Sequence, residues 1–295
     1  MAVLQLERAL GQLAPDQPGH GVFVAPFISA ESAKICIEAG MGYVDFSGNA
    51  QLSFDGVYIE TRSAENPYRE KREVRSLFTP KAERMLRVLL TPPLRAWKVG
   101  ELATAAGVSF GQVSKVRKHL IDQEWAKAGG DGLWLEKPVE VAEAWRKSYS
   151  ARLNSREGHY TLLHGEALET ATRSALTEAG AHAVLASYSA ARWIAPYARQ
   201  ATQFFYADEI GAPILKRHLQ LQPVPRGENV VLMQPREDDV FSGRIEAAPG
   251  IWCTGLVQTW LDLTVAGERG GEAADHLLSE KLLPAWNRGR DERTG

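Results

Sequence analysis

The sequence predicts an α+β protein of several domains, and three observations lead to this fold class. Strand-like runs separated by turn signals occupy residues 1–66, helical periodicity dominates residues 76–150, and helices alternate with strands over residues 156–286. At 295 residues the chain is long enough for two or three such domains. We expect residues 287–295, "NRGRDERTG", to form a disordered tail because they are polar and terminal.

Charge and cysteine content exclude several classes of protein. The formal net charge is −2, so any surface for nucleic acid must come from local segregation of charge. Two cysteines, Cys36 and Cys253, are too few for a disulfide framework or a thiolate zinc site. The first residues do not have the pattern of a signal peptide, and no run of about 18 apolar residues is present. We therefore expect a cytoplasmic protein without a membrane helix.

Residues 1–66 predict a small α/β unit. Residues 1–14 have the spacing of an amphipathic helix, with an apolar stripe of Leu4, Leu6, Ala9, Leu10 and Leu13. "VFVAPF" predicts a strand, and Ser29 can cap a helix that ends at Gly40. Three strand-like runs follow, "GYVDF", "AQLSF" and "VYIETR", with turn signals between them. The polar stretch "SAENPYREKREVR" then predicts a connector.

Residues 76–150 predict a winged helix–turn–helix. "PKAERMLRVLLT" supplies a first helix, with Pro80 in its first turn. In "ELATAAGVSFGQVSKVRKHL", Gly107 suits the turn between two helices because glycine tolerates positive φ. Ser109 can cap the second helix, whose inward positions are Val113, Val116 and Leu120. "WAKAGGDGLWLEK" predicts the strand, turn and strand of a wing.

The outward face of the second helix carries the residue types that contact DNA. Its side chains are cationic or form hydrogen bonds, as at base edges and phosphates. Between Arg69 and Glu124 twelve cations and six acids give a local net charge of +6. The predicted DNA-binding residues are Ser109, Gln112, Ser114, Lys115, Arg117, Lys118 and His119, with further contacts from Lys98, Arg72, Arg75 and Lys127. The hypothesis requires Lys115 and Lys118 to be exposed. The alternative is a protein-interaction adaptor, since winged helices also bind proteins.

A metal-dependent nuclease is a second alternative. Nucleases of the PD-(D/E)xK type place an aspartate, and then an acid and a lysine, on adjacent strands to hold Mg²⁺ and orient water. Asp45 and Glu60 have a permissible spacing, but Arg62 stands where the lysine would be and stays protonated. We favour a structural interpretation in which Asp45 and Asn49 build the tight turn "DFSGN".

Residues 156–286 predict an α/β domain with the element order of a nucleotidyltransferase. An active enzyme needs a Gly-Ser loop and an Asp-x-Asp pair for Mg²⁺. Here "LASYSAARW" has Ser187 and Ser189 without the glycines, and the paired acids in "YADEIG" and "REDDVF" are adjacent, so a strand would point them to opposite faces. We predict no catalytic residue, no metal site and no cofactor. Asp262 is expected to cap a helix or pair with Arg269.

The chain resembles the AbiEi-like antitoxins of type IV toxin–antitoxin systems. The resemblance is carried by "YVDFSGNAQL", by the winged helix, by "ENVVLMQPREDDVFSG" and by "VQTWLDLTVAGERGGEAADHLL". It implies a non-enzymatic repressor that binds double-stranded DNA at its own promoter. It also implies a nucleotidyltransferase toxin that is counteracted without a stable complex. In better-known members the winged helix comes first, whereas about 75 residues precede it here, which leaves a stand-alone regulator as an alternative.

Overall fold

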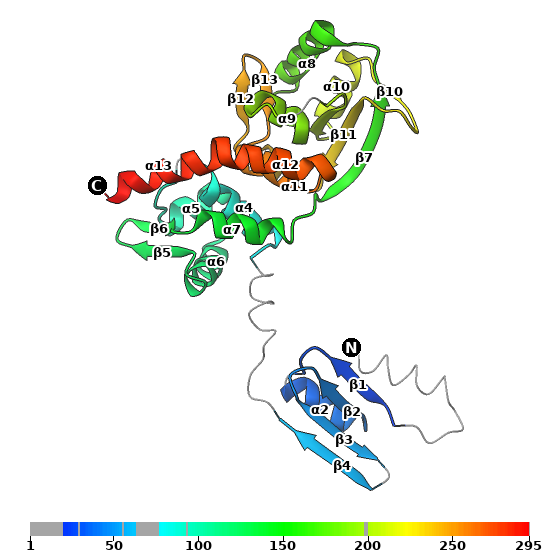
Figure 1. The fold of residues 1–295 in the computed structure, drawn as a ribbon, viewed down its shortest axis with the longest axis vertical. Coiled ribbons are helices and arrows are strands. Elements are labelled where there is room, and N and C mark those ends of the chain that lie inside the picture. The colour runs from blue at the N-terminus through cyan, green and yellow to red at the C-terminus, as the bar shows by residue number, and fades with distance from the viewer. Residues whose placement is uncertain are drawn as a thin grey trace. The chain divides into compact units, whose positions relative to one another are not determined.

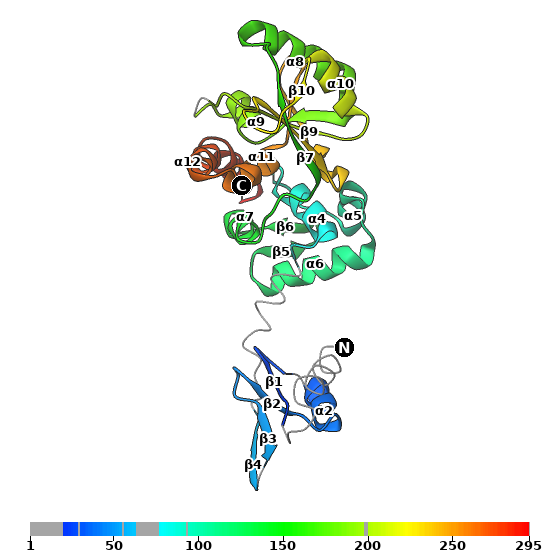
Figure 2. The same ribbon diagram turned by 90° about the vertical axis from the view of Figure 1, so that its right-hand side faces the viewer.

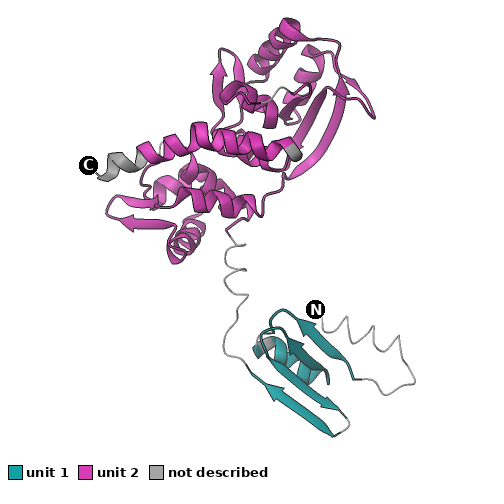
Figure 3. Cartoon of the chain, in the orientation of Figure 1, with its two compact units in different colours: residues 1–74 teal, residues 75–295 magenta. Residues whose placement is uncertain are grey.

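The computed structural model describes residues 20–28, 30–54, 56–62, 77–92, 94–197 and 200–294. The chain divides into two compact units, residues 1–74 (unit 1) and residues 75–295 (unit 2), as Figure 3 shows. The boundary predicted near residue 150 therefore lies inside one compact unit. The structure is mixed α and β, in agreement with the predicted class. The predicted helix at 1–14, together with Arg72 and Arg75, lies outside the described residues.

Unit 1 is a four-stranded sheet with a helix on one face (Figure 2). Its elements are β1 (Val22–Ala25), α2 (Ala30–Glu38), β2 (Gly42–Asp45), β3 (Ala50–Phe54) and β4 (Val57–Thr61). The strand order is β1-β2-β3-β4, with β1 parallel to β2 and the other pairs antiparallel. The core beneath α2 contains Ile28, Cys36, Met41 and Tyr43. These elements lie where the sequence predicts them.

Unit 2 begins with three helices and a hairpin, which we call the α4–β6 module. Its elements are α4 (Pro80–Leu90), α5 (Val99–Ala106), α6 (Phe110–Asp122), β5 (Ala126–Gly129) and β6 (Gly132–Leu135), followed by α7 (Pro138–Arg146). Leu86, Leu90, Leu102, Val113 and Leu120 are fully buried in it. The apolar residues recur at helical spacing because each helix turns one face to this core.

A seven-stranded mixed sheet forms the other half of unit 2 (Figure 1). Its strands are β7 (Leu153–Tyr160), β8 (Ala183–Leu185), β9 (Gln203–Ala207), β10 (Gln222–Pro223), β11 (Val230–Pro235), β12 (Ile245–Ala248) and β13 (Ile251–Cys253), in the order β10-β7-β11-β9-β8-β13-β12. The central strands are covered on both faces, since every residue of β8 is buried. The sequence predicts β9, β11 and β13 but not β7, β8, β10 and β12.

Helices surround this sheet in two groups. One contains α8 (Gly165–Ala179) and α10 (Gly211–His218), which pack together. The other contains α9 (Ser187–Ile194), α11 (Leu256–Thr264) and α12 (Glu268–Leu277). A π-helical turn, Leu278–Leu282, leads into α13 (Leu283–Thr294).

The helix α13 runs where the sequence predicts a disordered tail. It continues α12 through the π-helical turn, so no new helix has to be nucleated, and nucleation is the unfavourable step. Trp286 anchors it: the side chain is 2% exposed and its Nε1 donates to the Leu90 carbonyl oxygen at 2.8 Å. The C-terminal helix therefore contacts α4.

Candidate nucleic-acid interface

The turn between α5 and α6 has the geometry that the sequence predicts. Gly107 is left-handed, with φ 60° and ψ 41°, and the Val108 amide donates to the Ala103 carbonyl at 3.0 Å. Ser109 is the N-cap of α6, and its Oγ accepts from the Gln112 amide at 3.3 Å. These local bonds end one helix and begin the next within three residues. They fix the direction in which α6 leaves α5.

The helix α6 presents two lysines on the side opposite its buried stripe. Val113, Val116 and Leu120 are at most 1% exposed, and at about 100° per residue Lys115 and Lys118 point away from them. Both lysines are exposed within unit 2. The requirement for exposed cations at these two positions is therefore met within this unit.

The other predicted DNA contacts lie around the same helix. Ser109, Ser114 and Arg117 are exposed, whereas Gln112 and His119 are half-buried on the flanks. Lys98 is exposed and is the N-cap residue of α5. Lys118 also pairs with Asp122, one turn later, at 3.1 Å. Exposed ion pairs of this kind contribute little to stability, so Lys118 can exchange this partner for a phosphate.

The hairpin β5–β6 carries the last predicted contact, Lys127. Its exposed Nζ lies 3.3 Å from Glu136, so part of its charge is compensated. Trp97 extends the hairpin through two backbone hydrogen bonds with Leu133, each 2.8 Å long, which sequence analysis missed. Gly132 has φ +121°, and a Cβ there would lie 2.3 Å from the Trp97 carbonyl oxygen. Glycine is therefore required where this third segment approaches the hairpin.

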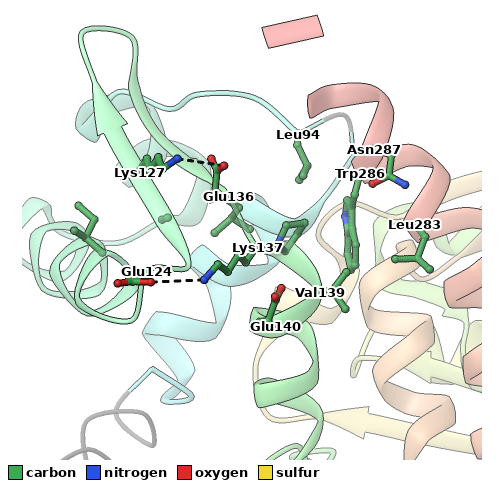
Figure 4. A pocket seen from close by; sticks show the side chains of 14 residues that line it. Leu94, Glu124, Lys127, Glu136, Lys137, Val139, Glu140, Leu283, Trp286 and Asn287 are labelled. Carbon is green, nitrogen blue, oxygen red and sulfur yellow. Dashed lines mark ion pairs between the residues drawn. The ribbon is translucent and has the colours of Figure 1, made fainter. Parts of the chain in front are cut away.

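A cleft of about 770 Å³ separates the hairpin from α13 (Figure 4). The indole of Trp286 forms one wall, together with Leu283. Two ion pairs lie on the other side, Lys127 with Glu136 and Lys137 with Glu124. The carboxylates compensate Lys127 of the hairpin and Lys137 at the start of α7, so this side of the module is less cationic than the outer face of α6.

A buried polar network joins α4 to the rest of unit 2, and sequence analysis missed it. The Arg87 Nε lies 3.1 Å from the Asp239 carboxylate, and its Nη1 donates to Gln258. Asp262 Oδ1 in turn accepts from Gln258 at 2.7 Å and from the hydroxyl of Tyr149 at 2.7 Å. Tyr206 donates to the same oxygen at 2.9 Å. Asp262 therefore contributes to this network, which corrects its expected pairing with Arg269.

Burial raises the pKa of Asp262 to about 6, against the lowering effect of Tyr149, Tyr206, Gln258 and Arg87. The raised pKa means that the folded state holds this proton more tightly than the unfolded chain does. Protonation of Asp262 thus adds stability that is complete below pH 4 and lost as the pH rises through 6. Among the described residues, no group is bonded to its Oδ2.

Asp262→Asn should remove this pH dependence. Between pH 4 and pH 7 the native protein should become less stable relative to the variant. We expect the difference between their free energies of unfolding to decrease by up to about 3 kcal/mol. Urea denaturation of both proteins across this range measures the difference. A difference that stays constant with pH would contradict a raised pKa at this carboxyl.

Asp45, the first acid of the nuclease alternative, stabilises a tight turn. Each oxygen of Asp45 accepts two hydrogen bonds, from the amides of Ser47, Asn49 and Ile28 and from the Asn49 side chain, at 2.7–2.8 Å. Burial raises the pKa of Asp45, but these bonds outweigh it and the pKa is lowered. Glu60 is bonded to the Tyr58 hydroxyl at 2.6 Å and paired with Arg62 at 3.0 Å. This arrangement favours the structural interpretation of Asp45.

Two residues considered for a nucleotidyl-transfer site, Asp208 and Ser189, also have structural partners. Asp208 accepts from the amides of Ile210 and Gly211, each at 2.8 Å, at the start of α10, and it contacts His182 at 2.6 Å. Ser189 Oγ accepts from the Phe204 amide at 2.8 Å. In the part of the chain that the structure describes, no group of three His, Cys, Asp or Glu side chains could hold a metal ion.

Comparison with known proteins gives little similarity. No family model and no curated protein matches the sequence. The crystal structure of the Megavirus polyadenylate synthase is similar with a TM-score of 0.36 and 10% identity, over 99% of this chain and 66% of that chain. A similarity of this size supports no assignment of activity. Within the described ranges, no helix combines the length and the apolar character that crossing a membrane requires.

Proposed function

We propose that this protein is a transcriptional regulator that binds DNA through α6. In this proposal the α4–β6 module is a winged helix, α6 is its recognition helix and the hairpin β5–β6 is its wing. The C-terminal half is a nucleotidyltransferase-like domain that has no catalytic role. The observation that carries the proposal is the outer face of α6, where Lys115 and Lys118 are exposed opposite a fully buried stripe.

The physical basis is the affinity of clustered cations for the phosphate backbone. Each phosphate that a lysine neutralises releases condensed counterions, which makes binding favourable and dependent on salt. The major groove is wide enough for one helix, so a protruding helix can bring hydrogen-bonding groups to the base edges. Gln112 and Ser114 supply such groups next to the lysines. Phosphate contacts would set the position of α6, and these side chains would select the sequence.

Replacing Lys115 and Lys118 together by alanine should weaken binding to a duplex from the region upstream of the gene. Because two phosphate contacts are lost, we expect the slope of log K against log salt to decrease by about two. Fluorescence anisotropy at salt concentrations from about 50 to about 200 mM measures both effects. The matched control is Lys147→Ala with Lys281→Ala, two exposed lysines away from α6, which should leave the slope unchanged. Equal slopes for the two double variants would argue for an adaptor that binds protein.

The antitoxin role belongs to the same proposal and is supported by the sequence resemblance alone. In this role the protein binds its own promoter, which is the operator, and counteracts a nucleotidyltransferase toxin. Co-expression with the product of the adjacent gene tests it. Growth that is inhibited by that product and restored by this protein would support the role. If the product of the adjacent gene does not inhibit growth, the proposal is reduced to a stand-alone regulator.

A further inference from the structure

The sheet of unit 1 has an apolar face turned away from α2. Pairing places Phe23, Tyr43 and Gln51 on the face that α2 covers. Alternate residues point to the other side, which we call the open face, and seven of them are large and hydrophobic: Val22, Val24, Val44, Leu52, Phe54, Val57 and Ile59. Figure 2 shows α2 on one side of this sheet. The seven side chains extend across all four strands.

The open face is exposed to an extent unusual for such residues. Val22 is 37%, Val24 57%, Phe54 36%, Val57 45% and Ile59 43% exposed. A contiguous apolar patch of this kind on a small domain marks a surface that another element covers.

We propose that residues 1–14 cover the open face as an amphipathic helix. The sequence predicts this helix, and its stripe contains Leu6, Ala9, Leu10 and Leu13. An isolated helix of this length is marginal in water, so its stripe needs an apolar surface to pack on. The open face supplies that surface within the same unit, and packing of the stripe on it would give the sheet a helix on each side.

The chain reaches the open face directly before β1. The ring of His20, the first described residue, lies 6.0 Å from the ring of Phe54, which belongs to the open face. Residues 15–21 separate the predicted helix from Val22, and seven extended residues span up to about 25 Å. Fourteen helical residues are about 21 Å long, and four strands are about 14 Å across. The helix therefore has the reach and the size to lie on the sheet.

A second copy of the chain fits the open face less well. Stable interfaces between proteins contain about 20–30 residues on each side, and the open face offers seven large apolar ones. One helix is enough to cover a patch of this size. Because residues 1–14 are tethered, they reach the face without the loss of freedom that association of two molecules requires.

Cross-linking of paired cysteines in the full-length protein tests the proposal. One variant combines Leu10→Cys with Val57→Cys on the open face. Its matched control combines Leu10→Cys with Tyr58→Cys, the next residue of β4, whose side chain points to the other face and is 62% exposed. The native cysteines, Cys36 and Cys253, are both buried and remain in place. A short bismaleimide is the reagent, and intact mass together with gel mobility identifies the products.

We expect a cross-linked monomer to form at least about tenfold faster in the Val57 variant than in the Tyr58 variant, because docking holds one thiol near the other. A third variant, Arg8→Cys with Val57→Cys, should react slowly, since Arg8 lies on the polar side of the predicted helix, opposite the stripe. Equal rates in all three variants would overturn the proposal. Cross-linked dimers as the main product would overturn it in favour of a second copy.

Discussion

Arg87→Met is expected to lower the free energy of unfolding by about 3–5 kcal/mol, because it breaks a buried ion pair by removing one partner. Arg87 lies 3.1 Å from Asp239, and the two side chains are only 10% and 12% exposed. Its guanidinium also donates to Gln258 and stacks over the Trp145 ring, 5.2 Å from the centroid. Without it, the Asp239 charge is buried and uncompensated. Urea denaturation followed by circular dichroism measures the loss.

The matched control for Arg87 is one turn earlier on the same helix. Arg84 pairs with Glu237, but these side chains are 32% and 41% exposed. Water screens such a pair, so Arg84→Met should lower the free energy of unfolding by less than about 1 kcal/mol. Asp239→Asn should remove part of the penalty in the Arg87→Met background, since the uncompensated charge is then absent. Equal losses for Arg87→Met and Arg84→Met would show that the network does not stabilise the fold.

Features fixed by neighbouring residues could be predicted from the sequence. Gly107, Ser109 and the stripe Val113–Val116–Leu120 act within a few positions of one another, and the structure has the turn, the cap and the buried face as expected. The tight turn after β2 is similar, because Asp45 bonds to Ser47 and Asn49 nearby. Propensity and spacing carry this information directly.

Features that depend on distant segments could not be predicted. Arg87 and Gln258 are 171 positions apart, and neither residue is unusual within its own helix. The sequence predicts that Asp262 caps a helix or pairs with Arg269, whereas in the structure two tyrosine hydroxyls and one glutamine amide donate to it. The strand β7, Leu153–Tyr160, is mostly polar in sequence and therefore lacks the apolar alternation by which a strand is recognised.

Trp286→Ala is expected to lower the free energy of unfolding by about 3–5 kcal/mol, the range for removing a buried tryptophan. The side chain is 2% exposed and fills the space between α13 and α4. Figure 4 shows its indole as one wall of the cleft beside the hairpin. Its removal leaves a cavity and an unpaired carbonyl oxygen at Leu90. Thermal and urea denaturation of the variant measure the loss.

Trp286→Phe separates the two contributions. Phenylalanine keeps most of the apolar contact but cannot donate to Leu90, whose carbonyl accepts from the indole at 2.8 Å. We expect this variant to lose about 1–3 kcal/mol, the cost of one buried acceptor without a partner. Because α13 is anchored through this residue, Trp286→Ala should also make the C-terminal helix more sensitive to protease, and Trp286→Phe much less so. If both variants unfold at the same urea concentration as the native protein, Trp286 does not anchor α13 to α4, and the helix must be held by its continuity with α12.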